Sequence, residues 1–192
     1  MTVPIVFWTV VGLGPIPFWH LLLHGALPFW RRHPRAFYGS AACLGIAFIP
    51  LARALASGSW TLFAAPAGIK PFCIAVSLLG LGVWVWSIAT LTPRRFFAWA
   101  VLRPEETPAE RIQSGPYRFT AHPCYVAMVA TVAASFLASG ELVLAVALGA
   151  MTLLLILVSL LEQRELKARL AAAPALRPAL SVMADEAVNQ AV

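Results

Sequence analysis

A histidine, two tyrosines and a cysteine stand within a short polar segment that leads directly into a long apolar stretch. The segment reads RIQSGPYRFTAHPCY from Arg111 to Tyr125. Its Gly-Pro pair predicts a turn, and Pro123 suits the first turn of a helix, where a missing N–H group costs nothing. One interpretation is structural, with a loop entering a membrane helix and tyrosines anchoring it at the interface. The other is a binding site, because the free N–H groups of a helix start favour an anionic group.

Glu162 closes the next apolar stretch and can reach the same place as this segment. At about 1.5 Å of rise per residue, the chain from His122 to Ser139 covers roughly 26 Å, and the return from Glu141 to Glu162 covers roughly 32 Å. The return therefore brings Glu162 to the depth of His122. We expect a histidine, two tyrosines and a carboxylate to converge there, and the faces of tyrosine rings suit a cation.

Two further histidines, His20 and His24, stand four residues apart in the first apolar stretch. This spacing allows both imidazoles to bind one metal ion or to serve separate haems. His122 is the one other histidine that falls within an expected membrane stretch. We therefore favour packing near the cytoplasmic end for both residues, and we predict no metal site.

The elements that must position these residues are membrane helices. The chain has 192 residues, of which 60% are hydrophobic and 11% are charged, whereas a soluble domain carries about 25% charged residues. This composition excludes a soluble domain, a disordered chain and a collagen-like protein, and it indicates an all-α membrane protein with several spans. The three cysteines lack the paired spacing of a disulfide framework or a metal knuckle.

Five apolar stretches approach the length of about 20 residues that a helix needs to cross a bilayer. Gly12, Gly14 and Pro15 predict a kink in the first stretch. The fourth carries small residues at every fourth position, which let membrane helices approach closely. We expect them to face Ala145 and Gly149, so that the last two helices form a tight antiparallel hairpin. The five expected transmembrane helices cover residues 5–29, 37–55, 71–91, 119–139 and 142–161.

Basic residues predict the orientation of these helices. Of the 14 lysines and arginines, Arg53 and Lys70 alone fall in segments that an outside N-terminus places outside. The other twelve fall in cytoplasmic segments or in the C-terminal part, a bias that sets membrane topology. We predict an outside N-terminus and a cytoplasmic C-terminus, and we attribute the net charge of +6 to cytoplasmic segments rather than to a nucleic-acid partner. Residues 1–170 form a single integral membrane domain, and residues 171–192, rich in alanine and proline, form a flexible tail.

The polar segment and the glutamate motif together carry a family resemblance. The pattern Gly-Pro-Tyr-Arg-Phe-x-x-His-Pro-x-Tyr is followed, after a membrane hairpin, by Glu-x-x-x-Leu. This combination resembles the superfamily of isoprenylcysteine carboxyl methyltransferases and phospholipid methyltransferases, which are integral membrane enzymes that use S-adenosylmethionine. The resemblance covers residues 111–170. The sequence departs from the family's pattern at Ala121, Ala127, Val158 and Gln163.

The resemblance implies a function and a cofactor site. It implies transfer of a methyl group from S-adenosylmethionine to a hydrophobic or lipid-like substrate that arrives from the bilayer. The resemblance also implies that the protein lies among the lipids of a prokaryotic cytoplasmic membrane. The mouth of the site then faces the cytoplasm. The alternative is a non-catalytic membrane subunit that keeps this fold and packs against partners. No catalytic residue and no oligomeric state is predicted. The residues that the resemblance assigns to the cofactor are Ile112, Tyr117, His122, Pro123, Cys124, Tyr125 and Glu162.

Overall fold

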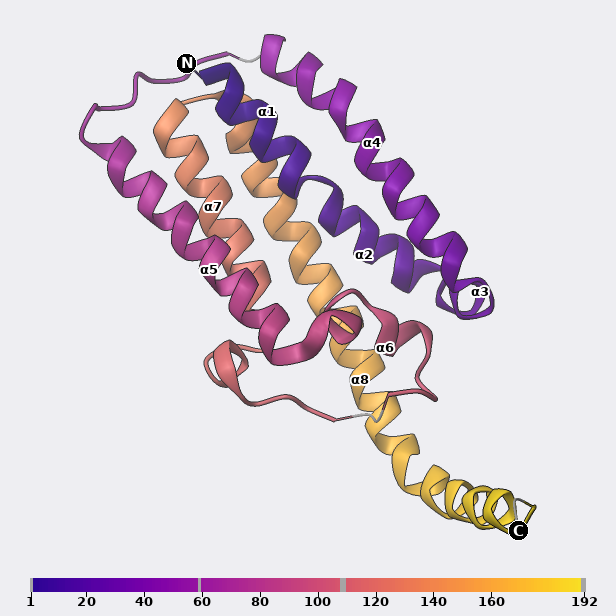
Figure 1. Cartoon of the computed structure of the whole chain (residues 1–192). Coiled ribbons are helices and arrows are strands. Elements are labelled where there is room, and N and C mark those ends of the chain that lie inside the picture. The colour runs from indigo at the N-terminus through magenta and orange to yellow at the C-terminus, as the bar shows by residue number, and fades with distance from the viewer. Residues whose placement is uncertain (1, 59, 108–109, 191–192) are drawn as a thin grey trace.

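The regular secondary structure in the described part of the chain is helical, as predicted (Figure 1). The computed structural model describes residues 2–58, 60–107 and 110–190. Within these ranges there is no strand, and one isolated antiparallel bridge joins Thr61 and Glu141. The helices are α1 (Thr2–Leu13), α2 (Pro15–Gly25), α3 (Leu27–Arg32), α4 (Pro34–Gly58), α5 (Ile69–Phe96), α6 (Trp99–Leu102), the 3₁₀-helix η1 (Gly115–Arg118), α7 (Pro123–Ser139) and α8 (Leu142–Gln190).

Four stretches of helix in the described residues are long and apolar enough to cross a membrane. α7, which was expected to be a fifth span over residues 119–139, has 17 residues because its helix begins only at Pro123. That length is the lower limit of the range of about 17–25 residues for a crossing. The four stretches are Val3–Gly25, Pro34–Gly58, Ile69–Leu102 and Leu142–Ala171.

The first span is broken where its glycines and prolines predict a kink. Gly14 separates α1 from α2, which begins with Pro15. Because Pro15 lacks an N–H group, it begins α2 without cost but cannot continue the hydrogen-bond ladder of α1. The first span was expected to run to residue 29, but it ends at Gly25. The non-helical Ala26 separates α2 from the short α3.

α7 packs against α5, α1 and α8. At Gly80 of α5, a Cβ would lie 2.7 Å from Oγ1 of Thr131 and 3.5 Å from the carbonyl oxygen of Ala127, so the small residues of α7 bring it close to α5. Gly149 of α8, which we expected these residues to face, has no atom within 4 Å of a Cβ and is exposed. The expected contact at Gly149 is therefore wrong. The apolar residues buried between α7 and α8 are larger: Met128, Val132, Met151 and Leu155.

The turn between α7 and α8 lies at the end of the bundle where α4 connects to α5. Gly140 has a φ of +71°, and a Cβ at this position would collide with the carbonyl oxygen of Phe63. The N–H of Leu62 donates to the carbonyl of Gly140 at 2.7 Å, and the N–H of Leu142 donates to the carbonyl of Trp60 at 2.8 Å. α3, α6, η1 and the start of α7 lie toward the opposite end (Figure 1).

α8 continues past the bundle to Gln190 (Figure 1). Its part as far as Ala171 forms the last membrane-capable stretch. The domain boundary at residue 170 and the flexibility of residues 171–192 stay predictions.

Candidate functional site

Glu162 of α8 is the centre of a polar network on the side of the bundle opposite the Gly140 turn. Its Oε1 accepts a hydrogen bond from the hydroxyl of Tyr125 at 2.5 Å, and its Oε2 lies 3.2 Å from Nδ1 of His122. The rings of His122 and Tyr125 are stacked, with centroids 5.2 Å apart and planes 3° from parallel. The polar segment and the glutamate motif therefore meet, as the helix lengths predict.

The start of α7 positions the two aromatic side chains. Pro123 occupies the first turn, and His122 stands at the N-cap in a non-helical conformation, with no side-chain bond capping the helix. Its imidazole is therefore available to Glu162 rather than committed to the backbone of α7. Pro123 has no N–H group, and the N–H groups of Tyr125 and Val126 donate to the carbonyl of His122. The first turn of α7 therefore leaves the N–H of Cys124 for an anionic ligand.

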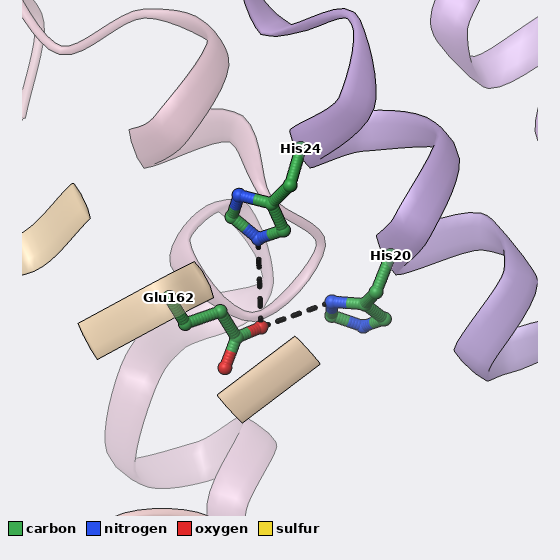
Figure 2. A group of neighbouring side chains, drawn as sticks. All are labelled: His20, His24 and Glu162. Carbon is green, nitrogen blue, oxygen red and sulfur yellow. Dashed lines mark ion pairs between the residues drawn. The ribbon is translucent and has the colours of Figure 1, made fainter. Parts of the chain in front are cut away.

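α2 adds two histidines to the network, as Figure 2 shows. Nδ1 of His20 lies 3.0 Å from Oε1 of Glu162, and Nε2 of His24 lies 3.9 Å from the same oxygen. One nitrogen of each ring and one carboxylate oxygen all lie within 4.8 Å of one another. Residues four apart share one face of a helix, so α2 presents both rings to α8. Nδ1 of His20 also lies 3.1 Å from the hydroxyl of Tyr125.

A second carboxylate, Glu165, supports His24 on its other ring nitrogen. Oε2 of Glu165 lies 3.4 Å from Nδ1 of His24, and its Oε1 accepts a hydrogen bond from Nη2 of Arg31 at 2.6 Å. Nε of Arg31 donates to the carbonyl of Val101 at 3.1 Å. The side chains of His24 and Glu165 are 4% and 14% exposed, so this chain of contacts is largely shielded from water.

Within the part of the chain that the structure describes, two imidazole nitrogens of the network are buried without a hydrogen-bond partner: Nε2 of His24 and Nε2 of His122. Buried polar atoms in folded proteins are nearly always paired. Glu162, with 25% of its side chain exposed, stands between the two rings. The network can therefore accept a further ligand on either side of this carboxylate.

The remaining predicted residues differ in burial and in their relation to this network. Pro123 and Cys124 are buried in the first turn of α7. Tyr117 is half-buried in η1, where burial raises the pKa of its phenol above the usual range and the nearby Cys124 thiol and Glu162 carboxylate raise it further. Ile112 is half-buried in the connection before η1, and it takes no part in the polar contacts of Glu162.

Comparison with known families gives a match over just more than half of the chain. The model of the phospholipid methyltransferase family matches residues 71–172. The chain belongs to the phospholipid methyltransferase family. The matched region contains α5 from Pro71 onward, α6, η1 and α7 together with the part of α8 that is long and apolar enough to cross a membrane. The resemblance that the two motifs predict is confirmed. A search of curated proteins and a search of solved structures found no match.

The family match does not include α2, so His20 and His24 belong to the part of the site outside it. We interpreted these histidines as packing residues, whereas the structure places both against Glu162. Glu165 and Arg31 were also missed. The i, i+4 spacing of the histidines within an apolar stretch was the available signal, since a polar pair on one face of a membrane helix needs a polar partner.

Proposed function

We propose that the chain is an integral membrane methyltransferase that transfers a methyl group from S-adenosylmethionine to a hydrophobic or lipid-like substrate. Membership of the phospholipid methyltransferase family supports methyl transfer at a membrane. The observation that carries the cofactor assignment is the meeting of His122 and Tyr125 with Glu162, at 3.2 Å and 2.5 Å. These residues come from the two motifs that the family resemblance assigns to the cofactor.

The chemistry of the site fits this cofactor. S-adenosylmethionine supplies an electrophilic methyl group on a sulfonium and also carries an ammonium, a carboxylate and a purine. The carboxylate of Glu162 and the stacked rings of His122 and Tyr125 suit the cationic groups. The uncapped start of α7 suits the carboxylate. To catalyse methyl transfer, the protein must mainly align the methyl group on the sulfonium with the acceptor atom of the substrate and exclude water.

The proposed orientation places the Glu162 network at the cytoplasmic side of five spans. Arg31, Arg95 and Arg103 lie on α3, at the end of α5 and directly after α6, and basic residues mark the cytoplasmic side of a membrane protein. The turn at Gly140 is hydrogen-bonded to the α4–α5 connection. This arrangement supports a full crossing by α7 despite its 17 residues.

The structure weakens one argument for the alternative, a non-catalytic subunit. The small residues of α7 could contact the helices of a partner protein as well as other helices of this chain, but Ala127 is buried beside Gly80 of α5. Ser135 is also buried, and its hydroxyl accepts a hydrogen bond from Thr9 of α1 at 3.0 Å. This surface is used inside the chain. We therefore favour the enzyme.

Isothermal titration calorimetry with S-adenosylmethionine in detergent tests the proposal on Glu162→Gln. The change removes the charge of a carboxylate that faces the proposed cofactor. We expect the binding free energy to weaken by about 1.5–3 kcal/mol, which is typical of hydrogen bonds to charged groups. The matched control is Gln163→Ala, whose side chain is exposed on the same helix and whose affinity should equal that of the parent.

The same preparations test the reaction itself. Membranes incubated with S-adenosylmethionine labelled in its methyl group should form a labelled product that partitions into organic solvent. The parent and Gln163→Ala should form this product, and Glu162→Gln should form less of it. Equal cofactor affinity in the parent and Glu162→Gln would contradict the cofactor assignment. Binding without any labelled product would favour the non-catalytic subunit.

A further inference from the structure

We propose that His20, His24 and Glu162 form a binding site for one divalent first-row transition-metal ion of the Zn²⁺ or Fe²⁺ type. The donors are two imidazole nitrogens and one carboxylate oxygen (Figure 2). Imidazole favours Zn²⁺, Fe²⁺ and related ions over Mg²⁺, which takes oxygen ligands. The inference goes beyond the proposed function. It shares Glu162 with the proposed cofactor site, but it is argued from the two histidines of α2, to which that site assigns no role.

The distances suit an ion at the centre of the three donors. Zinc binds imidazole nitrogen and carboxylate oxygen at about 2.0–2.2 Å, so two ligand atoms of a tetrahedral site lie roughly 3.3–3.6 Å apart. Oε1 of Glu162 is 3.0 Å from Nδ1 of His20 and 3.9 Å from Nε2 of His24. These two separations lie on either side of the tetrahedral value. All three donor atoms lie within 4.8 Å of one another, so the third separation, between the two imidazole nitrogens, is at most 4.8 Å.

His24 is the residue that most needs an ion. Its side chain is 4% exposed, and its Nε2, directed toward Glu162, has no hydrogen-bond partner among the described residues. Its Nδ1 faces the carboxylate of Glu165, which Arg31 holds at 2.6 Å. Metal-binding histidines usually donate their second N–H to a carboxylate or carbonyl, which fixes the ring and its tautomer. Glu165 therefore prepares Nε2 of His24 as a ligand with a free lone pair.

His122 orients the carboxylate of Glu162. Oε2 lies 3.2 Å from Nδ1 of His122, so Oε1 is the oxygen that faces the histidines of α2 and could bind an ion there. Tyr125 donates its single hydroxyl proton to this Oε1 at 2.5 Å. That hydroxyl can then offer only a lone pair to Nδ1 of His20 at 3.1 Å. Nδ1 must either carry its own proton or direct its lone pair at an ion, and the second state is the one we propose.

Three protein ligands leave one position of a tetrahedral ion open, which is the arrangement of catalytic rather than structural zinc sites. The open position would lie in the network that contains Tyr125 and His122, beside the start of α7. A water molecule or the acceptor group of a substrate would occupy it.

Metal titration of the full chain in detergent tests the site. The protein carries a histidine-free purification tag and Cys43→Ser, which removes an exposed thiol that could bind metal. After treatment with a chelator, it is titrated with Zn²⁺ by calorimetry, with Co²⁺ by visible absorption, and with Mg²⁺ as the ion that should not bind. We expect one Zn²⁺ or Co²⁺ per chain, with cobalt bands that report nitrogen and oxygen ligands.

Variants assign the site to its residues. His20→Ala and His24→Ala should abolish the one-ion binding, whereas His33→Ala, which changes an exposed histidine, should bind like the parent. Glu165→Gln should keep one ion but weaken its affinity by about 10- to 100-fold, which is typical of a lost supporting residue. If His24→Ala does not fold, His24→Gln, which keeps a polar side chain, replaces it.

Affinity for S-adenosylmethionine is measured on the same samples, so loss of the metal and loss of the cofactor are separable. Saturable binding of one ion that requires both histidines supports the site, whatever the result for the cofactor. Absence of stoichiometric Zn²⁺ and Co²⁺ binding in the parent would overturn it. Equal binding by the parent and His24→Ala would also overturn it, because the ion would then bind without His24.

Discussion

Tyr125 connects the two sides of the network, because its hydroxyl donates to Glu162 at 2.5 Å and lies 3.1 Å from Nδ1 of His20. Tyr125→Phe removes the hydroxyl and keeps the ring that stacks on His122. We expect the free energy of unfolding to fall by about 1–3 kcal/mol, the cost of leaving buried polar partners unsatisfied. Tyr38→Phe is the control, since its hydroxyl makes an exposed hydrogen bond, and it should cost less in the same denaturation experiment.

Tyr117 predicts a dependence of stability on alkaline pH. Burial holds its pKa above the ordinary value of 10.0 in the folded chain, whereas the unfolded chain loses this proton near pH 10. Above that pH the unfolded state binds fewer protons than the folded state, so stability falls as pH rises. Tyr117→Phe should therefore lose less stability than the parent between about pH 9 and 11. Parallel curves for the two proteins would contradict this prediction.

The sequence predicts the partners of Glu162 only in part. His122 and Glu162 can be brought together from the lengths of two consecutive helices, because the rise of a helix is constant. His20 cannot be placed in this way, since its position depends on the break at Gly14 and on the packing of α2 against α8. The partner of Glu165 cannot be predicted from helix lengths either, because Arg31 is 134 residues away in the sequence.

At the scale of the helices, Gly80 predicts how closely α5 and α7 must pack. A Cβ at Gly80 would lie 2.7 Å from Oγ1 of Thr131, while a Cβ at Gly82 would meet no atom within 4 Å. Gly80→Ala should lower the free energy of unfolding by about 1–3 kcal/mol through overpacking. Gly82→Ala, the control on the same helix, should raise it by up to about 1 kcal/mol. Denaturation in mixed detergent micelles measures both, and equal effects would mean that α5 is not tightly packed at Gly80.

The small residues of α7 also show what composition leaves open about helix packing. Their spacing correctly predicts a close approach by another helix, and Ala127 and Ser135 are buried. It does not say which helix approaches, because α5 and α8 are both apolar enough to cross a membrane. Exposed Gly149 shows that α8 does not take this place there, and Gly80 shows that α5 does. The choice depends on matched positions on two helices that are far apart in the sequence.

At the scale of the whole molecule, the two ends of the bundle differ in chemistry. One end holds the turn at Gly140 beside the α4–α5 connection. The other holds the Glu162 network together with η1 and the segment that follows α6, where Arg95 pairs with Glu110 and Arg103 with Glu105. Hydropathy and charge predict this asymmetry without any tertiary information, because both act on each segment separately.

The asymmetry leads to a prediction about topology, tested by cysteine labelling in sealed vesicles of known orientation. In a Cys43→Ser background, exposed Ser57 at the end of α4 and exposed Gln113 before η1 are each changed to cysteine. Arg164, exposed on α8, is changed in a third protein. A membrane-impermeant maleimide should label Ser57→Cys from the outside, and Gln113→Cys and Arg164→Cys only from the cytoplasmic side. All three should react once detergent opens the vesicles, which controls for accessibility.

Labelling of Ser57→Cys and Gln113→Cys from one side would mean that α5 does not cross the membrane. Labelling of Gln113→Cys from the outside would place the Glu162 network on the side opposite the one predicted from the basic residues.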